Sequence, residues 1–228
     1  MFELDVHPSR DGELAVIHDP TLDRTTSGQG AVIAQDWNVL ARYELSGSPG
    51  ERIPRLGEIL TLMAAADASV IVEIKEGADG ASYPEIVPRV LAAIAAAGMT
   101  ARCRISAFHW PTLVELRRHS ADIALIGVAE EAGLGALGGL RAALAQLVGI
   151  GANDIGLHHG LIDRDMVAAA RACGLGVGAW TVNDGAGIRQ LARLDIDWIM
   201  TDRPDMAFAA LADPGWCREG GWHDKRAV

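Results

Sequence analysis

Glu3 and Asp5 lie two positions apart in one short apolar segment, and Glu73 and Lys75 lie two positions apart in another. Side chains two positions apart on a β-strand point to the same face, so each pair is expected to project together. Three carboxylates that converge would repel one another unless they are protonated or bound to a cation. An all-oxygen ligand set favours Mg²⁺ or Ca²⁺ over zinc, and Lys75 would offer a point charge to a phosphoryl oxygen.

The Glu-x-Asp spacing also has a purely structural interpretation. Charged residues are common at strand ends, where they pair with surface arginines or cap helices. The spacing alone therefore does not identify a metal site. The prediction depends on all three carboxylates meeting at one place.

His18 follows a second apolar run and is itself followed by Asp19. An imidazole titrates near neutral pH and suits proton transfer to a leaving alkoxide, with Asp19 placed to orient the ring. A structural histidine that holds a loop carbonyl is the alternative. His158 and His159 end another apolar run and are weaker candidates, because adjacent strand residues point to opposite faces.

Trp180 stands near the end of an apolar run at 176–181, in a chain with only 5% aromatic residues. An indole at the mouth of a site would form one wall of a substrate pocket, and we predict this position for Trp180. The alternative is that it fills the protein interior.

Short β-branched runs alternate with segments of helical spacing along most of the chain, which predicts a parallel sheet covered by helices. Strands are predicted at 2–6, 14–17, 70–75, 102–108, 123–128, 154–157, 176–181 and 197–201. Helices are predicted at 56–66, 84–97, 110–119, 134–148, 163–173, 185–194 and 205–211. A tight turn joins the first two strands as in a hairpin.

Repeated strand–helix units favour a (β/α)8 barrel or a doubly wound sheet, and a complete barrel takes about 250 residues. The sequence of 228 residues begins inside a strand. We therefore expect an α/β fold, a (β/α)8 TIM barrel over residues 1–212 that lacks its first strand and helix. Residues 20–54 are expected to form a small inserted lobe after the second strand, and residues 213–228 a flexible tail.

Thirty acidic and twenty basic residues give a net charge of −10, which argues against nucleic-acid binding. No apolar run approaches the roughly 18–20 residues of a membrane span, so no integral membrane contact is expected. Three widely spaced cysteines indicate neither a disulfide framework nor a zinc motif and fit a reducing compartment. We expect a cytoplasmic protein, with the reservation that a shortened N-terminus would hide a signal peptide.

Taken together, these segments resemble the glycerophosphodiester phosphodiesterase family over nearly the whole chain. The resemblance rests on Phe-Glu-Leu-Asp-Val at 2–6, Val-Ile-His-Asp-Pro-Thr-Leu-Asp-Arg-Thr-Thr-Ser-Gly at 16–28, Ile-Pro-Arg-Leu-Gly-Glu-Ile-Leu at 53–60, Val-Glu-Ile-Lys at 72–75, Ile-Ser-Ala-Phe at 105–108, Ala-Trp-Thr-Val-Asn-Asp at 179–184 and Ile-Met-Thr-Asp-Arg-Pro-Asp at 199–205. It implies a barrel enzyme that hydrolyses glycerophosphodiesters to glycerol 3-phosphate and an alcohol. The implied cofactor is one divalent cation, Mg²⁺ or Ca²⁺, and the implied partner is a small-molecule phosphodiester.

The resemblance also implies roles for the residues singled out above. The family roles map onto metal ligands Glu3, Asp5 and Glu73, an acid–base residue His18, a phosphate contact Lys75 and a pocket wall Trp180.

The sequence departs from the family pattern at its start. The family opens with a strand ending in His-Arg, which supplies a second acid–base histidine, and with a helix beginning Pro-Glu-Asn; neither occurs here. Our hypothesis is that the natural reading frame begins upstream of Met1. Two other interpretations stay open: a catalytically impaired remnant that binds glycerophosphate or a partner, and a phosphodiesterase that cleaves lysophospholipids.

Overall fold

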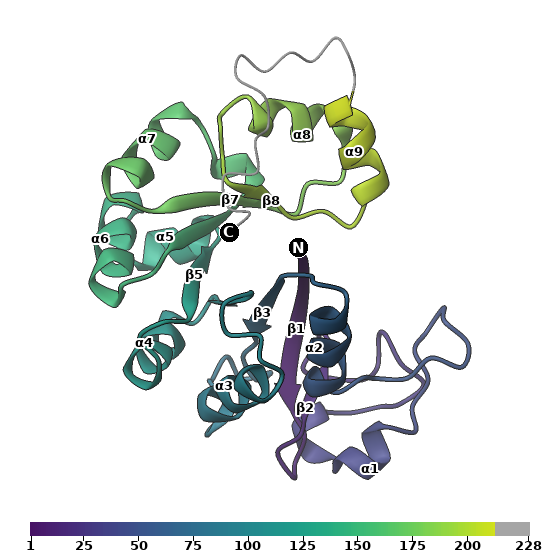
Figure 1. Ribbon diagram of the computed structural model, residues 1–228. Helices are drawn as coiled ribbons and strands as arrows, with labels where there is room; N and C mark the ends of the chain where they lie inside the picture. The colour runs from purple at the N-terminus through teal and green to yellow at the C-terminus, as the bar shows by residue number, and fades with distance from the viewer. Residues whose placement is uncertain (213–228) are drawn as a thin grey trace. The chain divides into compact units, whose positions relative to one another are not determined.

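The computed structural model describes residues 1–212, in which short strands alternate with helices in an α/β fold (Figure 1). The predicted flexible tail, 213–228, lies outside the described residues. The chain divides into two compact units. The first contains residues 1–128 and 149–153, and the second contains 129–148 and, within the described chain, 154–212.

The sheet of the first unit carries its strands in the order β2-β1-β3-β4-β5. Their bounds are β1 Phe2–Pro8, β2 Leu14–Val16, β3 Val70–Ile74, β4 Cys103–Ala107 and β5 Ala124–Ala129. The strands β1, β3, β4 and β5 pair in parallel, whereas β2 runs antiparallel to β1. The predicted hairpin between the first two strands is therefore confirmed.

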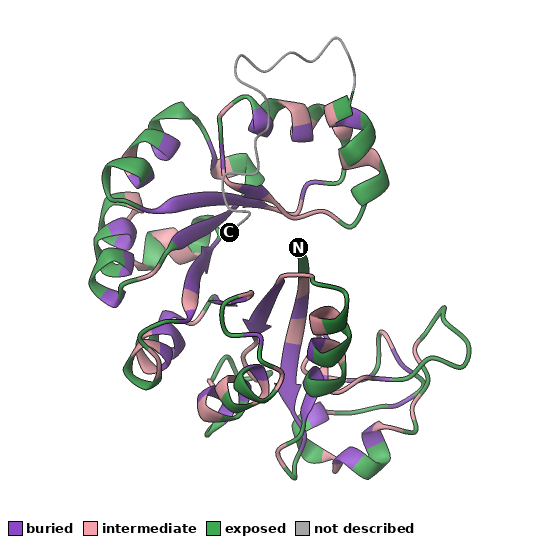
Figure 2. Cartoon of the chain, in the orientation of Figure 1, coloured by how far each residue is buried: buried purple, intermediate pink, exposed green. Residues whose placement is uncertain are grey.

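Helices follow the strands of the first unit and cover its sheet (Figure 1). They are α2 Leu56–Ala65, α3 Ile86–Ala96 and α4 Trp110–His119. In α3 the buried residues Val90 and Ile94 recur at helical spacing, which turns one apolar stripe inward. Figure 2 shows the same division, with buried strands and with helices that are exposed on their outer faces.

The second unit has a parallel sheet of β6 Asp154–His158, β7 Gly176–Trp180 and β8 Trp198–Ile199. Its remaining elements are α5 Glu131–Ala136, α6 Leu140–Ile150, the 3₁₀ helix η2 His159–Leu161, α7 Arg164–Ala172, α8 Gly185–Ala192 and α9 Pro204–Ala212. None of the helices in the described part of the chain has the length and apolar character needed to span a membrane.

One predicted element is wrong. The continuous helix expected over 134–148 is two helices, α5 and α6, which end and begin on either side of a Gly-Gly pair. Gly138 and Gly139 have φ values of +85° and +91°, a left-handed conformation that glycine adopts without steric cost and that terminates a helix. The other predicted elements agree with the structure to within two residues at each end.

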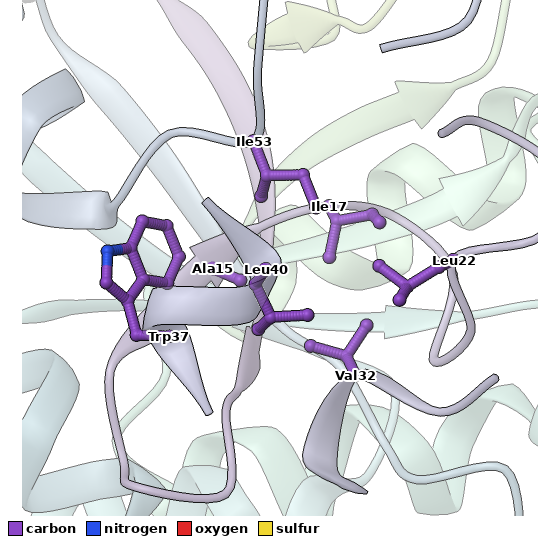
Figure 3. Packing of buried hydrophobic residues seen from close by; sticks show 7 residues of the cluster. All are labelled: Ala15, Ile17, Leu22, Val32, Trp37, Leu40 and Ile53. Carbon is purple, nitrogen blue, oxygen red and sulfur yellow. The ribbon is translucent and has the colours of Figure 1, made fainter. Parts of the chain in front are cut away.

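Residues 20–54 contain two short helices, η1 Val32–Ala34 and α1 Trp37–Leu40, and share an apolar cluster with residues in and just after β2. The cluster contains Ala15, Ile17, Leu22, Val32, Trp37, Leu40 and Ile53. Figure 3 shows Ile17, Leu22, Val32 and Leu40 pointing toward one another. Because Ile17 lies just after β2, the cluster fixes the segment that carries His18 to residues 20–54.

The second unit contains a glycine whose lack of a side chain is required by packing. A Cβ atom at Gly178 in β7 would overlap the indole of Trp198 in the neighbouring strand β8. We expect Gly178→Ala to lower the free energy of unfolding by about 1–3 kcal/mol, because both groups belong to a sheet and have little freedom to move. Urea denaturation followed by circular dichroism measures this change.

Gly57→Ala is the matched control. A Cβ atom at Gly57 in α2 would meet nothing within 4 Å, so alanine there is expected to leave stability unchanged or raise it by up to about 1 kcal/mol. Equal stability of the Gly178→Ala variant and the wild type would contradict the packing argument.

Candidate active site

Strands β1 and β3 bring the three predicted carboxylates together. Asp5 and Glu73 are direct partners in the parallel register, and Glu3 lies two residues before Asp5 on the same face. One carboxylate oxygen from each residue lies within 4.8 Å of the others. Glu73 is buried, whereas Glu3 and Asp5 are partly buried. The convergence expected from the sequence is therefore present in the structure.

Lys75, just after β3, binds two of these carboxylates. Its Nζ atom lies 3.0 Å from Asp5 Oδ1 and also forms an ion pair with Glu73 Oε1. Burial lowers the pKa of Lys75, but Glu73 and Asp5 raise it by more, so the net pKa lies above its usual value. The Phe108 ring lies beside the ammonium, with its centroid 5.9 Å from Nζ. Lys75 is therefore a fixed positive charge at the edge of the cluster.

One ammonium group does not neutralise three carboxylates. Burial raises the pKa of Glu3 to about 8, and repulsion from Asp5 and Glu73 contributes to this rise. Burial also raises the pKa of Glu73, against the attraction of Lys75. These raised pKa values show that the carboxylates cannot all stay ionised without a further positive charge. A hard divalent cation would supply that charge, and the cluster offers the oxygen ligands that such a cation prefers.

Hydrogen bonds hold both the backbone next to His18 and the His18 ring. The amide N–H of Ile17 donates a 3.1 Å hydrogen bond to the carbonyl oxygen of Asp5, which ties this segment to the strand of the carboxylates. The His18 side chain is 61% exposed, and its Nδ1 atom lies 2.7 Å from Asp19 Oδ1. An ionised carboxylate only accepts, so Nδ1 donates and Nε2 is the nitrogen that can exchange a proton with a bound molecule.

Arg24 fixes the orientation of Asp19. Its guanidinium donates from Nε to Asp19 Oδ2 at 2.5 Å and from a terminal nitrogen to Asp19 Oδ1 at 2.8 Å. These hydrogen bonds, followed by the contact with His18, lower the pKa of Asp19 far below its usual value. Asp19 is thus in contact with His18, as expected from the sequence, whereas the role of Arg24 was not predicted.

Two further residues near the site were missed by the sequence analysis. His7 is fully buried on β1, and its Nδ1 and Nε2 atoms lie 2.8 Å from Tyr83 Oη and 3.1 Å from the His18 carbonyl oxygen. Burial lowers the pKa of His7. The sequence contains a signal for His7, since it continues the alternate positions of Glu3 and Asp5, but none for Tyr83.

Trp180 is at the end of β7 in the second unit, as predicted, and is partly buried. The His158 ring meets it edge to face, with centroids 5.5 Å apart and planes at 84°. His158 and His159 are both exposed, with ring centroids 4.4 Å apart, because the strand ends at His158 and a 3₁₀ turn begins at His159. These three rings form an aromatic group at the carboxyl end of the second sheet.

Residues 1–206 match the sequence model of the glycerophosphoryl diester phosphodiesterase family. The chain belongs to this family. A glycerophosphodiester phosphodiesterase of Caldanaerobacter subterraneus subsp. tengcongensis is 30% identical over 210 residues, which cover 89% of this chain and 82% of the relative. A glycerophosphodiester phosphodiesterase of Bacillus altitudinis is 30% identical over 215 residues, which cover 90% and 83%.

Solved structures share the family fold. The crystal structure of a glycerophosphodiester phosphodiesterase from Agrobacterium tumefaciens str. C58 aligns with a TM-score of 0.75 at 27% identity and covers 91% of this chain and 86% of that one. A phosphodiesterase from Oleispira antarctica, solved in complex with the product sn-glycerol-3-phosphate, aligns with a TM-score of 0.76 at 21% identity, with coverage of 92% and 84%. The predicted family and its α/β fold are confirmed, whereas the absence of a first strand and helix stays a prediction.

Proposed function

We propose that this chain hydrolyses glycerophosphodiesters to glycerol 3-phosphate and an alcohol, using one divalent cation, Mg²⁺ or Ca²⁺. Membership of the glycerophosphoryl diester phosphodiesterase family makes it a phosphoric diester hydrolase. The observation that carries the metal-dependent form is the cluster of three carboxylates beside one lysine. The names of the curated relatives support glycerophosphodiesters as the substrate class.

Glu3, Asp5 and Glu73 would hold the cation through their carboxylate oxygens. When bound, a divalent ion withdraws charge from the phosphoryl oxygens and lowers the barrier to attack at phosphorus. The three side chains come from two paired strands, so their positions are fixed before substrate arrives. This preorganisation avoids the free-energy cost of gathering charged groups during the reaction.

Lys75 and Trp180 would contact the substrate. The Lys75 ammonium is held by two carboxylates of the cluster, Asp5 and Glu73, and would attract a non-bridging phosphate oxygen. Trp180 presents an indole at a strand end, where it offers an apolar surface to the glycerol or alcohol portion.

His18 would move a proton at Nε2. Because Asp19 holds the Nδ1 hydrogen, the opposite nitrogen faces solvent or substrate and can transfer a proton to the departing alkoxide oxygen. An alkoxide is a poor leaving group, so its protonation assists cleavage of the P–O bond.

A second candidate function is binding of glycerophosphate without efficient turnover. The architecture proposed for either function is the one expected from the sequence: residues 1–212 as a TIM barrel of the family type without its first strand and helix, and residues 20–54 as a lobe. The two functions differ in whether product forms on the timescale of an enzyme assay.

A chelation experiment tests the proposed function and is our second prediction. The full chain, treated with EDTA and then dialysed, should release glycerol 3-phosphate from glycerophosphocholine at less than about 1% of the rate with Mg²⁺ or Ca²⁺ restored, because the carboxylates then repel the phosphate. A coupled glycerol 3-phosphate assay measures the rate, and lysophosphatidylcholine is run in parallel.

The outcomes separate the alternatives. Activity that is indifferent to chelator contradicts the carboxylate site. Cation binding by calorimetry without product from either substrate supports the binding function. Faster release from lysophosphatidylcholine than from glycerophosphocholine would assign the lipid-cleaving alternative.

A further inference from the structure

His7 occupies a place where three segments of the site meet. It lies two residues after Asp5 on β1, it contacts the main chain of His18, and it contacts Tyr83 in the connection between β3 and α3. That connection begins at Lys75.

The hydrogen bonds of the His7 ring show which of its nitrogens donates and which accepts. The His18 carbonyl oxygen can only accept, so the Nε2 atom of His7 carries a hydrogen and donates at 3.1 Å. In a neutral ring the Nδ1 atom then accepts, and the Tyr83 hydroxyl donates to it at 2.8 Å. The rings of His7 and Tyr83 meet edge to face at 82°, with centroids 5.6 Å apart. The His18 carbonyl oxygen therefore fixes the tautomer of His7, and the Tyr83 hydroxyl, which also lies 3.5 Å from the Glu76 carbonyl oxygen, occupies the remaining ring nitrogen.

Burial makes this arrangement rigid. His7 is 0% exposed and Tyr83 is 9% exposed, so water does not compete for either hydrogen bond. By contrast, the His18 side chain is 61% exposed, and its ring contacts Asp19, which is itself near the surface. The position of the His18 backbone thus depends on a buried neighbour.

We infer that His7 is a positioning residue for the proposed reaction: with Tyr83 it fixes the His18 main chain relative to the carboxylates of β1. This inference rests on the proposed function, in which His18 transfers a proton. His7 does not touch the substrate. His7 influences the position from which His18 transfers a proton, and displacements of about 1 Å at such a position change rates by about 100-fold.

Four variants of the full chain test the inference. His7→Phe keeps a planar ring of similar size and removes both nitrogens, whereas His7→Gln keeps an amide N–H that can reach the His18 carbonyl. Tyr83→Phe removes only the hydroxyl. Tyr43→Phe is the matched control, because it removes a comparable 3.0 Å hydrogen bond from Tyr43 Oη to Gln35 in residues 20–54.

We expect His7→Phe to lower kcat about 10- to 100-fold, with KM and the calorimetric Ca²⁺ affinity within about threefold of wild type, since the ligands and Lys75 are unchanged. His7→Gln should recover most of this loss. Tyr83→Phe should lower kcat by about 3- to 10-fold, and Tyr43→Phe should stay within about twofold. If kcat and Ca²⁺ affinity fall together in the His7 and Tyr83 variants while KM rises, these residues have a purely structural role and the inference is overturned.

A spectroscopic readout keeps the inference separate from the proposed function and from folding of His7→Phe. In ¹⁵N-histidine-labelled protein, with the His18 ring signals assigned by a His18→Asn variant, Tyr83→Phe should shift or broaden those signals and Tyr43→Phe should not. Unchanged His18 signals in Tyr83→Phe overturn the inference even where phosphodiesterase activity is normal. Changed signals in a protein without phosphodiesterase activity support the positioning and refute the proposed function alone.

Discussion

Glu73→Gln is expected to lower kcat/KM for glycerophosphocholine by about 1,000-fold or more. Glutamine has nearly the same size as glutamate but is neutral, so the variant removes a cation ligand without opening a cavity. Glu73 is 6% exposed and lies between Asp5 and Lys75, where solvent cannot replace the lost charge. A bound cation contributes several kcal/mol to stabilising the transition state, which corresponds to this loss of rate.

Two measurements distinguish loss of the cation from loss of the fold. Calorimetry should show that Ca²⁺ affinity falls by at least about tenfold, because one of three anionic ligands is gone. Thermal denaturation without metal should remain cooperative, because the neutral amide also removes the repulsion between Glu73 and the carboxylates of Glu3 and Asp5. Glu51→Gln, at an exposed position in residues 20–54, is the matched control and should be as active as the wild type. Full activity in Glu73→Gln would refute the assignment of the cluster as the cation site.

His18→Gln is expected to lower kcat by about 10²- to 10⁴-fold while KM and Ca²⁺ affinity change little. This is the range observed when a general acid or base is removed. The side chain is largely exposed, so its replacement has little effect on packing. Steady-state kinetics with glycerophosphocholine measures the loss, and the exposed His119 changed to Gln serves as the control.

The leaving group provides a sharper test of the role of His18. A glycerophosphodiester of p-nitrophenol releases a weakly basic phenolate, whose departure needs no proton. The deficit of His18→Gln should therefore be at least about tenfold smaller with this substrate than with glycerophosphocholine. An equal deficit with both substrates would show that His18 does not protonate the departing oxygen.

The acidic cluster could be predicted from the sequence because its members obey the simplest periodicity in protein structure. Glu3 and Asp5 alternate with apolar residues on one strand, and Val70 to Ile74 forms an equally regular second strand, so their common face follows from strand geometry alone. The parallel register that sets Asp5 opposite Glu73 was not derivable from either segment. That register depends on how the segments that connect the two strands pack.

The supporting residues were harder to predict for physical reasons. Arg24 and Tyr83 reach the site from segments without periodic structure, and nothing in the local sequence indicates which way such segments turn. The helix expected over 134–148 failed for a related reason: its apolar spacing continues through Gly138 and Gly139, and only their backbone conformation breaks it. Apolar periodicity thus located strands and helices well, but not the polar contacts made by loops.

The pairing of β1 with β3 has a consequence for folding. A slip of a single residue between them would turn Glu3 and Asp5 toward the layer occupied by Leu4 and Val6, burying two charges among hydrocarbon side chains at a cost of several kcal/mol. Misaligned intermediates are therefore penalised by the same groups that the proposed chemistry uses. We therefore expect the charges of Glu3 and Asp5 to disfavour off-register pairing of β1 with β3 during folding, and neutral variants to populate misaligned intermediates more often.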